Sequence, residues 1–284
     1  MKDELNKESS QRYYYDEQYY QNKLVIPYDR NESHWIQFFG NVAAQIVQII
    51  KPGSVMDMGC AKGFLVESLR DRGVQAYGVD ISDYAISQVR EDIKQFCRVG
   101  AVTEPLDRDY DLITCIEVLE HVTEEESEIA IRNMAMRTQN ILFSSSSTDF
   151  DEPSHINVKP VLKWLECFSK YDFYPDVTID FGFIQPWSFL LRKRSPKVPE
   201  DILNTFACLI NTKISEHSLK VQLNQLKTTV ESQQLELNRI HKSFGGRLFK
   251  KGNQIKDTLV PLKSRRRRIY NLIRAWTTGV QPNK

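Results

Sequence analysis

The sequence lacks the features of an oxidised, secreted or membrane-embedded protein. Its five cysteines are odd in number and scattered, and no two form a C-x-x-C pair, which argues against a disulfide framework and against a zinc site. No stretch approaches the ~20 apolar residues of a membrane-spanning helix. The first twenty residues are polar and aromatic, without the apolar core of a secretory signal. We therefore expect a protein of the reducing cytoplasm.

The chain also lacks a strong net charge, because 38 Lys and Arg residues are balanced by 37 Asp and Glu residues. The balance is uneven along the chain. Residues 242–284 hold twelve basic residues and a single acid, Asp257, so the preceding residues carry an acidic excess. With 41% apolar residues, 284 residues can bury one sizeable core and a small second unit, which excludes a disordered protein.

Between residues 35 and 192, short apolar runs alternate with stretches of helical spacing, which is typical of a doubly wound α/β sheet. Ser82 is expected to cap a helix with an apolar stripe from Ile86 to Phe96, and Thr123 with Glu126 forms a capping box for another. Two late strands without a helix between them could pair antiparallel at the sheet edge. The expected strands are residues 55–58, 76–79, 97–99, 112–116, 141–144, 177–181 and 188–191.

Beyond this domain, assigned to residues 35–195, we expect a linker and short helix at 196–212 and a coiled coil at 213–244. The apolar positions alternate in steps of four and three, which is the seam of a left-handed coiled coil and predicts a homo-oligomer. A long helix packed on the domain is the alternative. The seam consists of Leu219, Leu223, Leu226, Val230, Gln233, Leu237, Ile240 and Phe244.

Residues 245–284 form a basic tail in which Ile269, Leu272, Ile273 and Trp276 share one helical face. A basic helix with an apolar face suits an anionic membrane surface, so we expect peripheral attachment at the inner face of a membrane. Nucleic acid would leave the apolar face without a use. A solvated tail with no partner is the remaining alternative.

The most specific chemical signal is the segment 55–64, with Asp80 ending the following strand. Small residues at Gly59, Ala61 and Gly63 permit a tight turn and close backbone approach to a ligand. Asp80 lies 21 residues after Gly59, close to the ~20 expected for a carboxylate that binds ribose hydroxyls. The pattern predicts a nucleoside cofactor, although glycines can also merely turn the chain.

Two departures from the dinucleotide fingerprint narrow the choice of cofactor. That fingerprint requires glycine at the position of Phe64, so NAD is disfavoured. Asp57 would repel a pyrophosphate but would attract a cationic ammonium. A nucleoside joined to an amino acid, with a positive sulfur, fits both acids.

These motifs, together with residues 111–122, resemble the successive motifs of class I S-adenosylmethionine-dependent methyltransferases. The resemblance covers roughly residues 35–192 and implies a Rossmann-like sheet with an antiparallel edge strand. It places the methionine part of the cofactor on the glycine loop, the ribose at Asp80 and the adenine near residues 100–102, where Ala101 replaces the acid of many members. The implied cofactor-binding residues are Asp57, Gly59, Cys60, Ala61, Gly63, Asp80, Ile81, Ala101 and Glu117.

Four further polar residues are expected at the same edge of the sheet, because Glu117, Glu120 and His121 follow the fourth strand and His155 follows the fifth. If residues 117–121 are helical, these side chains converge. Two carboxylates and two imidazoles suit Mg²⁺, Mn²⁺ or Zn²⁺, with oxygen ligands favouring the harder ions. Without a metal, His121 or His155 would be the general base, or Glu117 caps a helix and His121 only packs.

The Glu-x-x-Glu-His pattern with a later histidine resembles the metal site of small-RNA 3′-end 2′-O-methyltransferases and is similar to ubiquinone-pathway O-methyltransferases. By that resemblance the cation polarises two neighbouring hydroxyls of the acceptor. An acidic body makes RNA an improbable substrate.

The preferred function is O-methylation of a sugar or glycan hydroxyl in cell-surface polysaccharide synthesis. A methyltransferase followed by a coiled coil and basic tail, with the segment 243–249 between them, resembles bacterial surface-polysaccharide enzymes. The aromatic residues of the N-terminal cap segment, residues 1–34, suit sugar rings, although they could equally serve as packing. The alternatives are a small lipid or quinone-like acceptor and a non-catalytic scaffold.

Overall fold

The computed structural model describes residues 14–23, 26–194 and 199–242. The chain divides into two compact units that meet between His217 and Ser218. Outside the described residues lie 195–198, in the expected linker, and 243–284, which include Phe244, the segment 243–249 and the basic tail. The expectations for them stay predictions.

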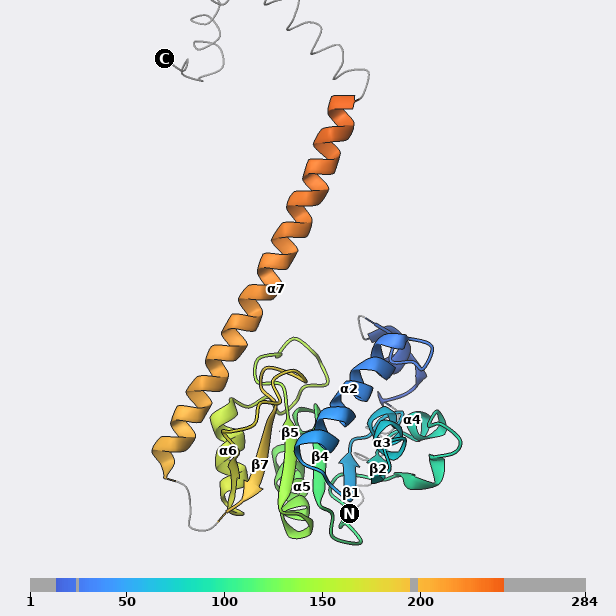
Figure 1. Cartoon of the computed structure of the whole chain (residues 1–284), viewed down its shortest axis with the longest axis vertical. Coiled ribbons are helices and arrows are strands. Elements are labelled where there is room, and N and C mark those ends of the chain that lie inside the picture. The colour runs from blue at the N-terminus through green and yellow to red at the C-terminus, as the bar shows by residue number, and fades with distance from the viewer. Residues whose placement is uncertain (1–13, 24–25, 195–198, 243–284) are drawn as a thin grey trace, which may run out of the picture. The chain divides into compact units, whose positions relative to one another are not determined.

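A seven-stranded sheet forms the centre of the first unit, in the order β3-β2-β1-β4-β5-β7-β6 (Figure 1). The first five strands pair parallel, as expected, and β7 pairs antiparallel with both β5 and β6. The strands are β1 (Ser54–Met58), β2 (Gln75–Asp80), β3 (Cys97–Val99), β4 (Leu112–Ile116), β5 (Asn140–Ser144), β6 (Phe173–Pro175) and β7 (Phe189–Lys193).

The prediction of a strand at residues 177–181 was wrong. On its outer side β7 pairs instead with β6, which ends at Pro175. The carboxylate of Asp176 accepts hydrogen bonds from the backbone N–H and hydroxyl of Thr178 and from Arg192, which turns the chain out of the ladder. Val177 is consequently 61% exposed rather than part of a strand.

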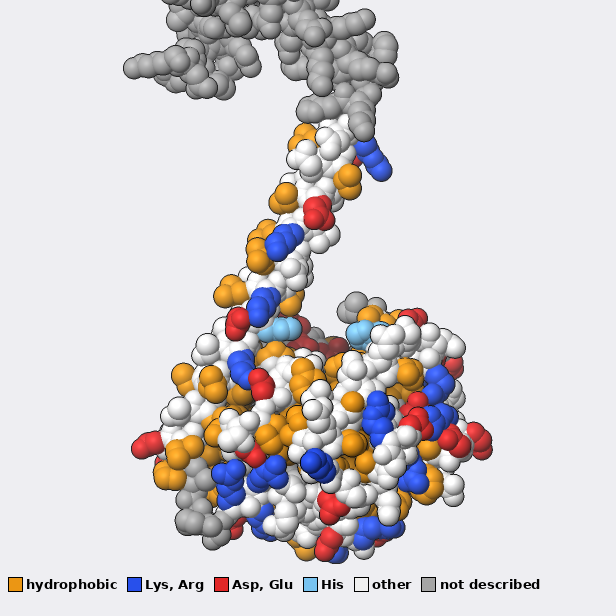
Figure 2. All heavy atoms as spheres, viewed as in Figure 1, with side chains coloured by type: hydrophobic (Ala, Val, Ile, Leu, Met, Phe, Trp, Pro, Cys, Tyr) orange, Lys and Arg blue, Asp and Glu red, His pale blue; other side chains and the backbone are white. Residues whose placement is uncertain are grey.

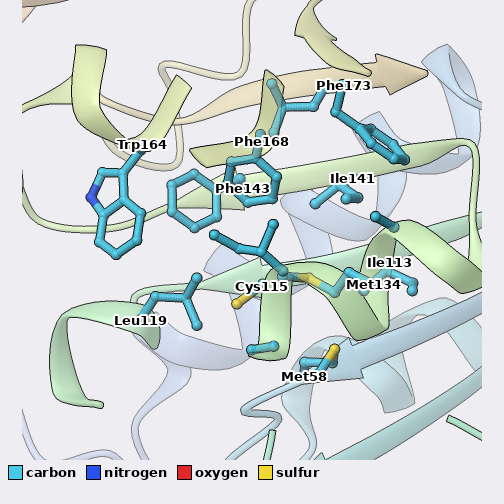
Figure 3. Close-up of a cluster of buried hydrophobic side chains, with 14 of the residues drawn as sticks. Met58, Ile113, Cys115, Leu119, Met134, Ile141, Phe143, Trp164, Phe168 and Phe173 are labelled. Atoms are coloured by element: carbon cyan, nitrogen blue, oxygen red, sulfur yellow. The ribbon is translucent and has the colours of Figure 1, made fainter. Parts of the chain in front are cut away.

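Helices cover both faces of the sheet, because successive strand residues point to opposite sides. Met56 and Ile113 face a core shared with helices α5 and α6, whereas Val55 and Leu112 face a core shared with α2 and α3. In the first core, Phe143 of β5 lies between Trp164 and Phe168 of α6 (Figure 3). The helices are α2 (Ser33–Ile49), α3 (Phe64–Arg70), α4 (Asp83–Ser87), α5 (Glu124–Arg137) and α6 (Val161–Ser169), and short turns are η1 (Tyr19–Lys23), η2 (Lys94–Phe96) and η3 (Leu119–His121).

Both predicted helix caps are present. Ser82 accepts a hydrogen bond from the backbone of Ala85, and Thr123 forms the reciprocal capping box with Glu126. The helix expected to reach Phe96 nevertheless ends at Ser87. Arg90 instead pairs with Asp71 at the end of α3, so tertiary contacts draw the chain away from the helical path.

The final described helix, α7 (Glu200–Lys242), is continuous for 43 residues. The short helix expected within residues 196–212 is therefore only its first part, where Phe206, Ala207 and Ile210 pack into the core beside α5 and α6. All described residues from Ser215 to Ile240 are exposed. Among the described residues, no helix has the length and apolar character needed to cross a membrane.

Candidate functional site

A cavity of about 540 Å³ lies at the carboxyl ends of the parallel strands, where folds of this topology bind ligands. Eight of the nine predicted cofactor-binding residues line it, and Gly63 does not. His121 and His155 also line it, whereas Glu120 does not. The eight are Asp57, Gly59, Cys60, Ala61, Asp80, Ile81, Ala101 and Glu117.

The loop after β1 depends on backbone conformations that favour glycine. Gly59 has a φ of 81°, and a Cβ added there would lie 2.3 Å from a methyl carbon of Val118. The backbone N–H groups of Gly59 and Cys60 both donate to the carbonyl of Val79, which holds the loop against β2. Gly63, at φ 72°, is the N-cap residue of α3, so its role is to start the helix rather than to line the cavity.

Asp80 is buried at the end of β2, and each of its oxygens accepts a backbone hydrogen bond. Oδ2 accepts from Ala61 and Oδ1 from Ser82, both at 2.8 Å. Burial raises the pKa of Asp80, and these two hydrogen bonds oppose that rise. Each oxygen keeps a second lone pair, so the carboxylate can also accept hydrogen bonds from the two hydroxyls of a ribose.

Asp57 lies at the end of β1, and Thr114 of β4 donates a hydrogen bond to it at 2.6 Å. Burial is the main cause that raises the pKa of Asp57 to about 7, against the opposing effect of Thr114. A nearby cation would stabilise the ionised form and bring the pKa down. This site therefore suits a positively charged group, and the contribution of Thr114 was not recognised from the sequence.

Aromatic residues of the N-terminal segment form one wall of the cavity. Tyr15, Tyr19, Tyr20, Tyr28 and Trp35 all line it. The backbone carbonyl of Tyr15 accepts a hydrogen bond from the Ser82 hydroxyl, which joins the segment to the end of β2. The described part of the N-terminal segment, from Tyr14 onward, thus lies over the loops that carry the buried acids.

Lys62, in the glycine loop, provides a second connection to that segment and was missed by sequence reasoning. Its side chain is 2% exposed, and its Nζ lies 3.6 Å from Asp29 and over the rings of Tyr20 and Tyr84. Burial lowers the pKa of Lys62, and Asp29 opposes that effect. The buried ammonium of Lys62 therefore connects the glycine loop to Tyr20 and to Asp29 of the N-terminal segment.

The two glutamates are placed differently from the helical expectation. Glu117 lies before η3 with a φ of 54°, and its carboxylate accepts hydrogen bonds from Ser144 and from Trp187. Glu120 is fully buried. The carboxylates are close enough to interact, and burial raises the pKa of both. Neither caps a helix, and the partner Trp187 had no signal in the sequence.

His121 and His155 come together in the lining of the cavity, with ring centroids 4.7 Å apart. The Nδ1 atoms lie 3.2 Å and 2.8 Å from the backbone carbonyls of Ser154 and Asp149, respectively. Because a carbonyl oxygen only accepts, Nδ1 carries the proton in each ring, and Nε2 keeps a lone pair.

The two imidazoles differ in their electrostatic surroundings. Burial and the neighbouring His155 lower the pKa of His121 to about 4. The Asp149 carboxylate lies 3.6 Å from Nδ1 of His155, where it would stabilise a positive ring.

The four-residue cation site expected from the sequence is not assembled as a whole. Ligand atoms of Glu120, His121 and His155 lie within 4.8 Å of one another, but Glu117 is not in this group. The oxygens of Glu120 already accept hydrogen bonds from Ser145 and the backbone of Ser146. One carboxylate and two imidazole nitrogens suit Zn²⁺ better than a hard cation such as Mg²⁺, and the predicted metal site stays a prediction.

Comparisons with known proteins find similar methyltransferases. Ubiquinone biosynthesis O-methyltransferase of Azoarcus sp. (strain BH72) is 31% identical over 107 residues, 34% of this chain and 45% of the relative. The protein of the same name from Nitrosomonas europaea is 32% identical over 97 residues, 31% of this chain and 41% of the relative. The chain thus spans less than half the length of these curated relatives.

A solved structure, magnesium protoporphyrin IX methyltransferase from Synechocystis PCC 6803 with bound SAM, has a TM-score of 0.46 and 18% identity, covering 65% of this chain and 94% of that chain. The family model described as "Methyltransferase domain" matches residues 26–176, more than half of the 284 residues. These residues include both acids, the glycine loop and both histidines, and the chain belongs to the methyltransferase-domain family.

Proposed function

We propose that this protein is an S-adenosylmethionine-dependent O-methyltransferase whose acceptor is a small, hydroxylated, quinone-like ring. The observation that carries the proposal is the shared cavity. It joins a nucleoside-type loop with two buried acids to a pair of imidazoles that can each accept a proton at Nε2. Membership of the family and the names of the curated relatives support the same reaction.

The residues present fit the methyl donor. Asp80 can bind the ribose hydroxyls, Asp57 suits the ammonium, and the loop at Gly59 leaves no room for a side chain where the backbone must approach the ligand. When bound, S-adenosylmethionine supplies a methyl group on a positively charged sulfur. Thr114 orients the Asp57 carboxylate, and Ala61 and Ser82 hold that of Asp80.

At the acceptor end, the chain binds, orients and deprotonates the hydroxyl. The tyrosine rings of residues 15, 19 and 20 present flat apolar faces that exclude water and suit an aromatic acceptor. Nε2 of His155 accepts the hydroxyl proton, and Asp149 stabilises the resulting imidazolium. The oxygen is left with the electron pair that would form the new bond to the methyl carbon, while the carbon–sulfur bond would break with its pair left on a neutral sulfur.

The choice of acceptor differs from the sugar or glycan preferred from the sequence. That preference depended on the C-terminal architecture, whereas the relatives at about 30% identity carry a ubiquinone biosynthesis name. The aromatic rings in the cavity lining are compatible with either acceptor, so the change depends on the relatives alone. We therefore propose the quinone-like acceptor and keep the sugar as an outcome of the test.

The test incubates the full chain with methyl-labelled donor and three acceptor sets: dihydroxylated aromatic and quinol compounds, sugars and lipid-linked oligosaccharides, and RNA. Label entering the first set supports the proposal. Label entering only glycan or RNA overturns the acceptor. Calorimetry with the donor alone separates the enzyme from a scaffold, because a scaffold binds no donor at high micromolar concentration.

Proton transfer without a metal is the version that we propose. The rate should survive exhaustive chelation and stay unchanged on addition of Mg²⁺ or Mn²⁺. Loss of activity on chelation, restored by either ion, would contradict metal-free proton transfer. It would favour a mechanism in which a cation bound by Glu120, His121 and His155 assists the reaction.

A further inference from the structure

The second half of α7 exposes a regular apolar seam. Every described residue from Ser215 to Ile240 is exposed, and hydrophobic side chains recur at intervals along this part of the helix (Figure 2). The apolar seam residues Leu219, Leu223, Leu226, Val230, Leu237 and Ile240 are each between 49% and 66% exposed. We propose that residues 219–240 pair, parallel and in register, with the same residues of another copy of this chain.

The helix needs such a partner for its stability. Isolated helices in water are marginally stable even when rich in alanine. Residues 215–240 contain β-branched Thr228, Thr229 and Val230 in succession, which lowers the intrinsic helix propensity. Packing of the apolar seam against a like surface supplies the missing stabilisation, as in coiled coils.

The width of the seam favours a single helix-sized partner. Steps of four and three place Leu223, Val230 and Leu237 at the a positions of a heptad repeat, with Leu219 and Leu226 at d positions. A helix that lies in a membrane surface presents a wider apolar face. Polar residues border this seam on both sides, so the strip matches the knobs-into-holes surface of a coiled coil.

Gln233, the polar d position, determines the orientation. In a parallel, in-register pair, Gln233 faces Gln233 of the other copy, and the two amides can hydrogen-bond to each other. In an antiparallel pair, a positions pack against d positions, so Gln233 always faces an apolar seam residue. In the register where Leu226 faces Leu237, for example, Gln233 faces Val230. The amide would then be buried without a partner, which is costly.

The flanking positions are compatible with the parallel arrangement. Contacts between copies would join each g position to the e position five residues later. The resulting pairs, Gln222 with Lys227 and Thr229 with Gln234, contain no like charges. Electrostatic repulsion therefore does not oppose parallel pairing along this stretch.

The first experiment measures the mass of the full chain by sedimentation at micromolar concentrations. The wild type should sediment as a multiple of 33.1 kDa, and a double variant Leu226→Glu, Leu237→Glu should sediment at 33.1 kDa. The matched control, Ser232→Glu, Asn238→Glu, changes the outer face of the same helix and should keep the wild-type mass. All three should bind the methyl donor equally, which shows that the domain is folded.

The second experiment tests orientation by disulfide formation. In a Cys208→Ser background, Leu219→Cys should form a covalent dimer under mild oxidation, since the parallel register brings the two positions together. Replacing Gln233→Leu should reduce the yield of that dimer, because other registers then become accessible. A monomeric wild type, an oligomer that survives the seam variant, or no cross-link at position 219 would each overturn the proposal. Binding of a monomeric wild type to anionic vesicles through the seam would assign it to a membrane instead.

Discussion

The two ends of the cavity are built from different kinds of group. The donor end uses backbone N–H groups and two buried carboxylates that lie within residues 57–82, on adjacent strands. The acceptor end that we propose uses the imidazoles of His121 and His155, which are distant in the sequence, and aromatic rings from residues 15–35 that also lie near the two acids. Backbone groups cannot be exchanged without altering the fold, whereas side chains can, so one fold can keep its donor and change its acceptor.

The strongest way to separate the two ends is the variant His155→Ala. Loss of a general base should lower the rate of methyl transfer about 10²- to 10⁴-fold. Donor affinity, measured by calorimetry, should stay unchanged because His155 belongs to the acceptor end. The control His217→Ala removes an exposed imidazole of α7 and should retain full activity. Equal loss of donor binding in the His155 variant would contradict the division into two ends.

The reverse pattern is expected for Asp80→Asn. The amide offers one acceptor oxygen instead of two, and its NH₂ group would oppose a backbone N–H of Ala61 or Ser82. Loss of charged hydrogen bonds to the ribose should weaken donor affinity about 100-fold in calorimetry. The exposed Asp83→Asn, in the first turn of α4, serves as the control. An Asp80 variant that binds the donor as tightly as the wild type would remove the basis of the donor site.

Asp57→Asn should weaken donor affinity and yet stabilise the protein in a pH-dependent way. The folded-state pKa of about 7 exceeds the ordinary 3.8, so the folded form binds the proton more tightly than the unfolded form. Wild-type stability should therefore fall as the pH rises from about 4 to 7. The shift corresponds to about 4 kcal/mol above pH 7.

Thermal unfolding at pH 4 and pH 8 measures this effect. The Asn variant should match the wild type at pH 4 and unfold at a higher temperature at pH 8, while its donor affinity falls about tenfold through loss of the charge beside the ammonium. Asp109→Asn, which removes an exposed carboxylate beside Arg137, should change neither quantity appreciably. If the unfolding temperatures of the variant and the wild type differ by the same amount at pH 4 and pH 8, ionisation of Asp57 does not destabilise the folded protein.

The smallest effect is expected for Lys62→Met, which tests whether the donor loop holds the N-terminal wall of the cavity. Met keeps most of the side-chain volume but loses the ammonium near Asp29, Tyr20 and Tyr84. Donor affinity should fall about fivefold, and limited proteolysis should cut residues 14–35 faster. Lys163→Met on the outer side of α6 is the control. Unchanged cleavage would mean that the rings alone hold the segment.

Much of the fold was readable from local patterns. The five parallel strands, the caps at Ser82 and Thr123 and the turn at Gly59 all follow from signals within a few residues. The errors arose where distant contacts decided the outcome. Arg90 bonds to Asp71 and ends the expected helix early, and Asp176 bonds to Arg192 and turns the chain where a strand was expected.

The candidate site divides in the same way. The sequence by itself determined the donor loop, because a left-handed glycine, a short turn and a carboxylate at a set spacing are local requirements of binding a nucleoside. Only the tertiary structure decided the acceptor end. It set Glu117 against Trp187 and closed Glu120 away from the cavity, whereas the approach of His155 to His121 was expected from their places after neighbouring strands. The direction of a polar side chain at the end of a strand depends on which groups, distant in the sequence, form hydrogen bonds with it. Neighbouring residues do not carry that information.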